Sequence, residues 1–421
     1  MGEMIQNIES IGIKVPNGFA ITTNAYHDFI KYNELDQKII DLVTGLDDTN
    51  LSELRKVGAE VRQLIRNGKF PKELQNEIRE KYQELSESYG QNMIDVAVRS
   101  SATAEDLPDA SFAGQQETFL NVRGSESILE AVRNCFASLF TDRAISYRNT
   151  FNYDHFDVAL SVCIQKMVRS DMAASGVAFS LDPESGFKDV VVVNGSYGLG
   201  EMVVQGAISP DEFIIFKPSL EKGYSSIIEK KIGNKDKKMI YGEDHGKLTK
   251  IVTVSEEQKE KFSITDKQAL EIAKWVSSIE KYYTNLKGRW CPMDVEWAID
   301  GVSGELYIVQ ARPETIHSQK KTKKLVEYHV QSEGKKPVVT GIAVGDGVAF
   351  GEVVIMQSMD GNIDENEFVE GSILVTDMTD PDWEPIMKKA SAIITNKGGR
   401  TCHAAIVARE MGLPAIVGCR N

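Results

Sequence analysis

Cysteine is scarce in this chain, and the few copies are widely separated. None falls at the Cys-x-x-Cys spacing typical of zinc sites, and there are too few for the disulfide framework of a small secreted fold. These two absences exclude both classes and fit a reducing cytoplasm, which is the predicted location. The five cysteines are Cys135, Cys163, Cys291, Cys402 and Cys419.

The chain also lacks a long apolar run and an excess of positive charge. No stretch is long enough to span a bilayer, and the segment from Met1 to Ser10 is too polar for a secretory signal. The chain carries 48 Lys and Arg residues against 62 Asp and Glu residues, a net charge of −14. Nucleic acid needs a basic footprint on its partner. We therefore expect neither a membrane nor a nucleic acid as partner, and any phosphate site must be local.

The chain is long enough for more than one domain. Its 421 residues, 42% of them hydrophobic, have the composition of a soluble enzyme. Apolar residues at helical spacing predict helices between about Asn24 and Tyr89, and short apolar runs predict strands further on. This mixture predicts an α/β or α+β class. The other predicted strands are 93–98, 158–165, 176–180, 190–193, 212–216 and 306–309, and the other predicted helices are 128–147 and 266–283.

A polar, lysine-rich stretch at 316–336 has the composition of a linker. It divides the chain into a first domain at 1–315 and a second at 337–421. A flexible coil of about twenty residues reaches on the order of 25 Å, so the stretch would serve as a swivel hinge. An ordinary ordered connection is the alternative.

One histidine stands apart from the others because it follows a glycine-rich loop. Gly398 and Gly399 precede Arg400, Thr401, Cys402 and His403, and an apolar helix pattern then runs to Met411 before a strand at 415–417. The free N–H groups and positive dipole end of a helix favour an anion, so a phosphoryl group on His403 would be stabilised there. We expect the other histidines to be surface or core residues: His27, His155, His245, His317 and His329.

A second constellation lies between Pro292 and Pro313. Asp294 and Glu296 alternate on one face of a predicted strand, and after a Gly301 to Gly304 turn the partner strand ends in Gln310, Ala311 and Arg312. Oxygen ligands on neighbouring strands beside an arginine suit Mg²⁺ bound to nucleotide phosphates. A solvated hairpin face is the alternative, but the residues around these positions are apolar.

A third set of polar residues follows the strand at 93–98. Arg99 and the hydroxyls from Ser100 to Thr103 come first, and a small-residue loop with Gly114 leads to Thr118. Such directed donors suit a polyphosphate. The loop lacks the lysine pattern of a P-loop, and the glycines from Gly195 to Gly200 alone predict no more than a turn.

These motifs resemble those of the phosphoenolpyruvate synthases and their relatives, the pyruvate phosphate dikinases. The string Gly-Gly-Arg-Thr-Cys-His-Ala-Ala-Ile-Val-Ala-Arg-Glu of this chain resembles the phosphohistidine signature of these enzymes. Its Thr-Cys-His form most resembles that of the synthases. The resemblance covers nearly the whole chain through Val-Arg-Ser-Ser-Ala-Thr-Ala-Glu-Asp, Phe-Ala-Gly-Gln-Gln-Glu-Thr, Ile-Gln-Lys-Met-Val, Tyr-Gly-Leu-Gly-Glu, Asp-Val-Glu-Trp and Tyr-Ile-Val-Gln-Ala-Arg-Pro-Glu-Thr. It implies an ATP-grasp nucleotide-binding domain followed by a small swivelling β/α phosphohistidine domain.

The resemblance also implies roles for individual residues. His403 would be the nucleophile, and Glu296 and Gln310 would hold Mg²⁺ as well as border ATP. Asp294 and Arg400 are weaker candidates, and Thr401 resembles the threonine that a regulatory kinase modifies. The remaining ATP-binding candidates are Arg99, Gly114, Thr118, Gln165 and Arg312.

The implied reaction converts ATP, pyruvate and water into AMP, phosphoenolpyruvate and phosphate. Two features depart from the family pattern. A lysine expected just before the segment from Gly2 to Met4 is absent, and so is the C-terminal barrel that binds pyruvate or phosphoenolpyruvate. We expect a part of a larger enzyme that performs at most the first half-reaction, with pyruvate reached through the missing domain.

Two other functions stay open at this point. A phosphotransferase of the same architecture could act on another acceptor, such as an antibiotic, although such enzymes usually insert an acceptor domain where this chain has a short linker. A catalytically silent nucleotide-binding module would fit the missing lysine. Against it stands the retention of His403 with Glu296 and Gln310, because a mere binder needs no nucleophile.

Overall fold

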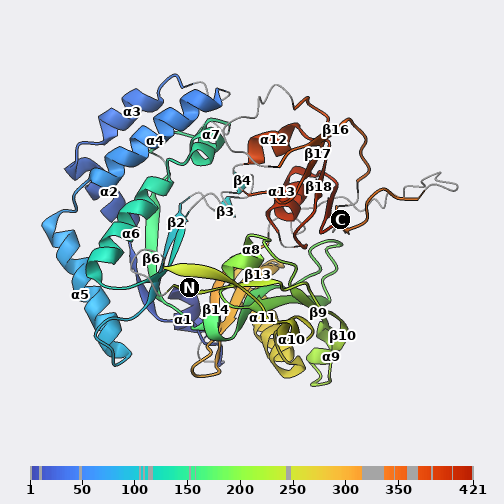
Figure 1. Cartoon of the computed structure of the whole chain (residues 1–421). Coiled ribbons are helices and arrows are strands. Elements are labelled where there is room, and N and C mark those ends of the chain that lie inside the picture. Colours follow the sequence, from blue (N-terminus) through green and yellow to red (C-terminus); the bar gives the residue numbers. More distant parts are fainter. Residues whose placement is uncertain are drawn as a thin grey trace. The chain divides into compact units, whose positions relative to one another are not determined.

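The computed structural model divides into two compact units (Figure 1). Unit 1 contains Met1–Val15, Val168–Ile240 and Lys250–Asn421, and unit 2 contains Pro16–Met167 and Tyr241–Thr249. In the part of the chain that the structure describes, no helix is both long and apolar enough to cross a membrane. The described residues are 2–8, 12–46, 50–103, 106–107, 110–111, 117–150, 153–156, 158–242, 248–314, 336–345, 347–357, 368–380, 383–400 and 402–419.

Unit 2 is a helical layer on a small antiparallel sheet. The strand order is β1-β6-β2-β5, and β2 at the centre pairs with both β5 and β6. The strands are β1 (Gly18–Ile21), β2 (Val96–Ala102), β5 (Thr118–Val122) and β6 (Leu160–Lys166), with a short separate pair, β3 (Asp106–Leu107) and β4 (Ala110–Ser111). The helices are α2 (Thr23–Tyr32), α3 (Asp36–Val43), α4 (Leu51–Asn67), α5 (Lys72–Ser88), α6 (Ser125–Ser138) and α7 (Asp142–Thr150).

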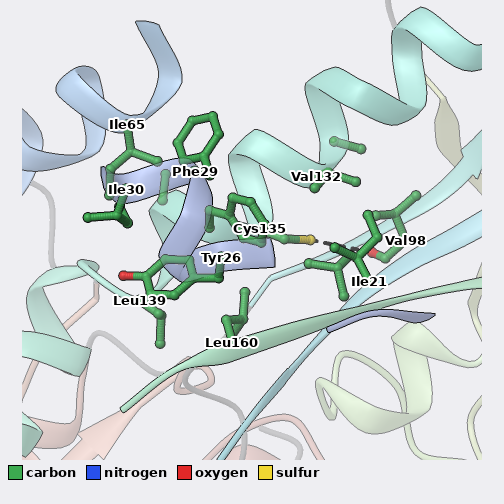
Figure 2. Close-up of a cluster of buried hydrophobic side chains, with 14 of the residues drawn as sticks. Ile21, Tyr26, Phe29, Ile30, Ile65, Val98, Val132, Cys135, Leu139 and Leu160 are labelled. Carbon is green, nitrogen blue, oxygen red and sulfur yellow. Dashed lines mark hydrogen bonds between the residues drawn. The ribbon is translucent and has the colours of Figure 1, made fainter. Parts of the chain in front are cut away.

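The core of unit 2 lies between its helices and its sheet (Figure 2). Phe29 of α2 packs against Phe136 of α6 with ring centroids 5.4 Å apart, and both side chains are fully buried. Each such side chain contributes roughly 1.5–3 kcal/mol by leaving water. The Cys135 thiol points at the Val98 carbonyl of β2, with sulfur and oxygen 3.9 Å apart. Burial raises the pKa of this thiol, which is therefore a packing group.

Two predictions for unit 2 need correction. The strand predicted at 93–98 is β2, which begins at Val96 and continues to Ala102 because Arg99 to Ala102 pair with β6. The helix predicted at 128–147 is two helices, α6 and α7. Arg62 of α4 explains the break, since its Nη1 donates to the Phe140 carbonyl and to the Asp142 carboxylate, both at 2.7 Å.

Unit 1 contains a six-stranded antiparallel sheet in the order β10-β9-β8-β7-β13-β14. Helix α11 (Asp266–Lys287) packs on β8 and β13, and it begins with a capping box between Thr265 and Gln268. The strands are β7 (Ala174–Phe179), β8 (Val190–Tyr197), β9 (Asp211–Phe216), β10 (Ile227–Lys231), β13 (Met293–Ile299) and β14 (Leu306–Pro313). Smaller elements are α1 (Gly2–Asn7), η2 (Ser170–Met172), α8 (Glu201–Val204), α9 (Lys217–Leu220), α10 (Glu256–Lys259) and the pair β11 (Lys237–Tyr241) and β12 (Thr249–Thr253).

The last part of unit 1 has its own sheet and core. Strands β16 to β19 run parallel in the sheet order β15-β19-β18-β17-β16, and β15 is antiparallel to β19. Helix α13 (His403–Met411) packs on β19, and the helix and strand predicted at the end of the chain are confirmed. The remaining bounds are β15 (Ile342–Val344), β16 (Val353–Ile355), β17 (Ile373–Thr376), α12 (Glu384–Lys389), β18 (Ala392–Thr395) and β19 (Ala415–Val417).

Candidate functional site

His403 is the first residue of α13, as the sequence predicts. Cys402 is the N-cap, with extended backbone and no side-chain hydrogen bond to the helix. His403 is therefore in the first turn, where the helix has free N–H groups and its positive dipole end. Cys402 is 4% exposed and burial raises the pKa of its thiol, which supports the prediction that it packs rather than reacts.

The sequence reasoning missed a residue that contacts the imidazole, Thr379. Thr379 lies just beyond β17, is 3% exposed, and its Oγ1 is 3.0 Å from Nδ1 of His403. When Nδ1 carries the proton, it donates a hydrogen bond to Thr379 Oγ1, and Nε2 then holds the lone pair of the neutral ring. In that tautomer Nε2 is the nucleophilic nitrogen. The sequence contained one signal for this contact: the apolar run 373–375 predicts a strand, and two threonines, Thr376 and Thr379, follow it.

Side-chain contacts tie together the loops that follow β17 and β18. The Lys397 ammonium donates to the Asp377 carboxylate at 2.6 Å, and Asn396 Nδ2 donates to the other carboxylate oxygen at 3.2 Å. The Lys397 amide also donates to the Asp377 carbonyl at 2.8 Å. The Lys397 hydrogen bond holds the pKa of Asp377 below its ordinary value. Parallel strands thus bring the loop before His403 and the loop carrying Thr379 to one edge of the sheet.

Arg400, a weaker candidate, and Thr401, the possible regulatory residue, directly precede Cys402 and His403. Arg400 Nη1 is 3.6 Å from the Glu212 carboxylate of β9, so its charge faces an acidic group. Thr401 lies outside the described residues, as does Gly114 of the predicted phosphate loop. Their roles stay predictions.

The hairpin of β13 and β14 brings the predicted metal ligands face to face. Glu296 is the cross-strand partner of Gln310, and Asp294 is the partner of Arg312. Met293 and Val295 are buried while Asp294 and Glu296 are half-buried, so the carboxylates lie on the face away from the core. Arg312 Nε lies 3.6 Å from Asp294 Oδ2. A β-bulge after Glu296 shifts the register that a regular hairpin would have.

This pair of residues fits Mg²⁺ bound together with phosphates. Glu296 and Gln310 offer a carboxylate and an amide oxygen in register, and Mg²⁺ prefers oxygen ligands. The described residues hold no cluster of three or more His, Cys, Asp or Glu side chains that could bind a metal by themselves. Mg²⁺ usually keeps waters and takes substrate phosphates as further ligands, so one carboxylate and one amide suffice.

The other predicted nucleotide residues lie on the sheet of unit 2. Arg99 of β2 has Thr118 of β5 as its partner on one side and Cys163 of β6 on the other. Gln165 is 4% exposed, and its Nε2 donates to the Pro16 carbonyl at 3.2 Å. Cross-strand partners lie on the same face of a sheet, and so do residues two positions apart in one strand. Arg99, its partner Thr118 and Gln165, which is two positions from the partner Cys163, therefore lie on the same face.

Comparison with known proteins identifies the family of this chain. The family model "Pyruvate phosphate dikinase, AMP/ATP-binding domain" matches residues 1–333, and the model "PEP-utilising enzyme, mobile domain" matches 368–421. The phosphoenolpyruvate synthases of Aquifex aeolicus, Synechocystis and Escherichia coli are 56%, 53% and 51% identical to this chain, of which each alignment covers 100%. The chain spans about half the length of these relatives, 49%, 51% and 51% respectively. Because the first model covers most of its length, the chain belongs to the pyruvate phosphate dikinase AMP/ATP-binding domain family.

Proposed function

We propose that this chain performs the nucleotide half-reaction of phosphoenolpyruvate synthesis, in which ATP phosphorylates His403 and AMP and phosphate are released. The observation that carries the proposal is the His403 imidazole at the start of α13 with its Nδ1 3.0 Å from Thr379 Oγ1. A binding module would need no imidazole held in this way. The printed name of the relatives, phosphoenolpyruvate synthase, supports pyruvate as the final acceptor.

The chemistry follows from a neutral imidazole. Nε2 attacks the β-phosphorus of ATP, the bond from that phosphorus to the oxygen it shares with the α-phosphorus breaks, and AMP leaves with the electron pair. Water then attacks the terminal phosphorus, phosphate leaves, and phosphohistidine remains. Bound Mg²⁺ would supply positive charge to the phosphate oxygens, and Glu296 and Gln310 would hold it. Arg99 and Arg312 would meet the remaining negative charge through directed N–H groups.

Three narrower predictions belong to the same proposal. The domain boundaries after 315 and before 337 follow from composition. A kinase acting on Thr401 would place a phosphate two residues from His403, where its charge would repel incoming ATP. The cytoplasm is the location that suits a metabolic enzyme with these widely separated cysteines.

The proposal is tested by asking which phosphate of ATP reaches the protein. Incubation with Mg²⁺ and ATP labelled separately at the α-, β- and γ-phosphorus should give acid-labile, base-stable protein label from the β-position alone. AMP and phosphate should appear in amounts equal to the label. Protein label from the γ-position with ADP as product would contradict the pyrophosphoryl route. ATP binding without any protein label would show that this chain does not catalyse the half-reaction.

The Thr379 contact leads to a separate prediction. Thr379→Val keeps the side-chain shape but removes the hydroxyl. Phosphorylation in a single turnover should slow about threefold to tenfold, the rate change that corresponds to the free energy of one hydrogen bond. Thr379→Ser should restore the rate, and ¹⁵N NMR should find less Nδ1–H tautomer in the valine variant alone.

Thr376→Val is the matched control for this experiment. Thr376 is another buried threonine at the same strand end, 4% exposed, and its hydroxyl bonds the Met378 carbonyl at 3.4 Å. Equal slowing by the two valine variants would show that Thr379 merely supports the loop.

A further inference from the structure

The chain passes between the two units at four places, and one carboxylate lies where two of them meet. The crossings follow Val15, Met167, Ile240 and Thr249. Asp95, immediately before β2, is 5% exposed. Its Oδ1 accepts from the Lys166 ammonium at 3.1 Å, and its Oδ2 accepts from the Tyr241 hydroxyl at 2.5 Å. Lys166 is the last residue but one before a crossing, and Tyr241 is the first residue after another.

Backbone hydrogen bonds bring a third crossing to the same point. The Met167 amide donates to the Asp95 carbonyl at 3.0 Å, and the Lys166 amide donates to the Asn17 carbonyl at 2.9 Å. Asn17 is the second residue of unit 2. The Lys166 ammonium also donates to the Met167 carbonyl at 2.8 Å. The end of β6, the start of β2 and the first residues of unit 2 are therefore joined around Asp95.

The charge of Asp95 is kept in spite of its burial. Burial alone would raise the pKa of this carboxyl, but the hydrogen bonds from Tyr241 and Lys166 bring the pKa below its ordinary value. Arg123 adds a more distant positive charge, with Nη2 3.9 Å from Oδ1. A buried charge with its partners in place resists rearrangement, since separating any one of them would leave the carboxylate unpaired in a poorly solvated position.

The tip of the β11–β12 hairpin, at Tyr241–Thr249, belongs to unit 2 and has a second hydrogen bond within that unit. Asn121 of β5 donates from Nδ2 to the Leu248 carbonyl at 2.8 Å. Asn121 is 8% exposed and has a φ of 57°, a conformation that residues other than glycine rarely adopt. Asp95 and Asn121 thus hold the two sides of the tip, at Tyr241 and Leu248, to neighbouring ends of the sheet.

The same crossing carries a residue predicted to border ATP. Gln165 directly precedes Lys166, is 4% exposed, and donates to the carbonyl of Pro16 at another crossing. Val96, the residue after Asp95, is the cross-strand partner of Lys166, and Arg99 lies further along the same strand. The positions of Gln165 and Arg99 on the sheet therefore depend on how β2 and β6 are held at this end.

We propose that Asp95 is a positioning residue for the nucleotide, fixing the end of β6 with Gln165 and holding the hairpin tip through Tyr241. The role for ATP rests on the proposed function, while the role in holding the crossings does not. Asp95 touches no substrate in this scheme and acts through the segments that it joins.

Two variants and a matched control test this role. Tyr241→Phe removes one hydrogen bond, and Asp95→Asn removes the charge with little change of shape. Asp142→Asn removes a different ion pair of unit 2, with Arg62 at 2.7 Å, which lies at none of the crossings. We would measure the Kd of the ATP analogue with a non-hydrolysable αβ bridge in Mg²⁺, the Tm, and hydrogen exchange of the Lys166 and Met167 amides.

We expect Asp95→Asn and Tyr241→Phe to raise the Kd about tenfold, equivalent to about 1.4 kcal/mol, and to speed exchange at Lys166 and Met167. Asp142→Asn should lower the Tm to a similar extent but leave the Kd and both exchange rates unchanged. A Kd within twofold of the parent in both test variants would overturn the nucleotide role. If the parent chain bound no nucleotide, the proposed function would fail, and unchanged exchange at Met167 would separately overturn the holding role.

Discussion

His403→Asn is expected to abolish the protein-bound label from ATP, a loss in rate on the order of 10⁴ or more. Asparagine keeps a short polar side chain at the start of α13, and its amide can still donate toward Thr379 Oγ1, which now lies 3.0 Å from the imidazole. It offers no basic nitrogen to attack phosphorus, however, and a missing nucleophile has no substitute within the site. Label counting after a single turnover, together with AMP release, measures the effect.

His27→Asn provides the control for this variant. His27 is an exposed histidine on α2, far along the chain from the proposed site, so its replacement should leave the label unchanged. The Kd of ATP should stay within about twofold of the parent in His403→Asn, because binding and attack use different groups. Label that persists in His403→Asn would place the phosphoryl carrier on another residue.

The sequence could predict the parts of the site that depend on short-range spacing. A glycine pair, a histidine and an apolar helix pattern occupy consecutive positions, and α13 indeed begins at His403. The alternation of Asp294 and Glu296 before a two-glycine turn likewise predicts a hairpin, and the register of β13 and β14 places Glu296 opposite Gln310. In both cases neighbouring residues settle the local structure, so that distant parts of the chain need not be known.

Contacts between distant segments could not be read in the same way. Thr379 comes 24 residues before His403, and the two meet because β17 and β18 are parallel neighbours. The break between α6 and α7 depends on Arg62, which lies 78 residues before the carbonyl that it binds. Sequence periodicity contains no information on which strand or side chain from elsewhere will satisfy a backbone group. Asp95 is the same kind of case, since Lys166 and Tyr241 follow it by 71 and 146 residues.

Under the proposed function, the charge of Glu296 should affect the phosphorylation rate more than that of any other acidic residue of the β13–β14 hairpin. Glu296 and Gln310 are cross-strand partners, so their side chains lie close together on one face of the sheet. Glu296 is the carboxylate of this pair, and Gln310 can offer only an amide dipole. Asp294 is already 3.6 Å from the Arg312 guanidinium and is therefore less available to a cation. Loss of the Glu296 charge would weaken the hold on Mg²⁺ where the phosphate charge develops.

Glu296→Gln should accordingly slow phosphorylation of His403 on the order of 10²–10³-fold, the usual effect of losing one preorganised electrostatic group. The Mg²⁺ concentration needed for half the maximal rate should rise, because a neutral amide attracts the cation less than a carboxylate does. Glu305→Gln is the matched control: Glu305 lies on the same hairpin, is 43% exposed and pairs with Lys14. A Glu296→Gln chain with the parent's rate and Mg²⁺ dependence would exclude Glu296 as a metal ligand, and would leave charge compensation to Arg99 and Arg312 alone.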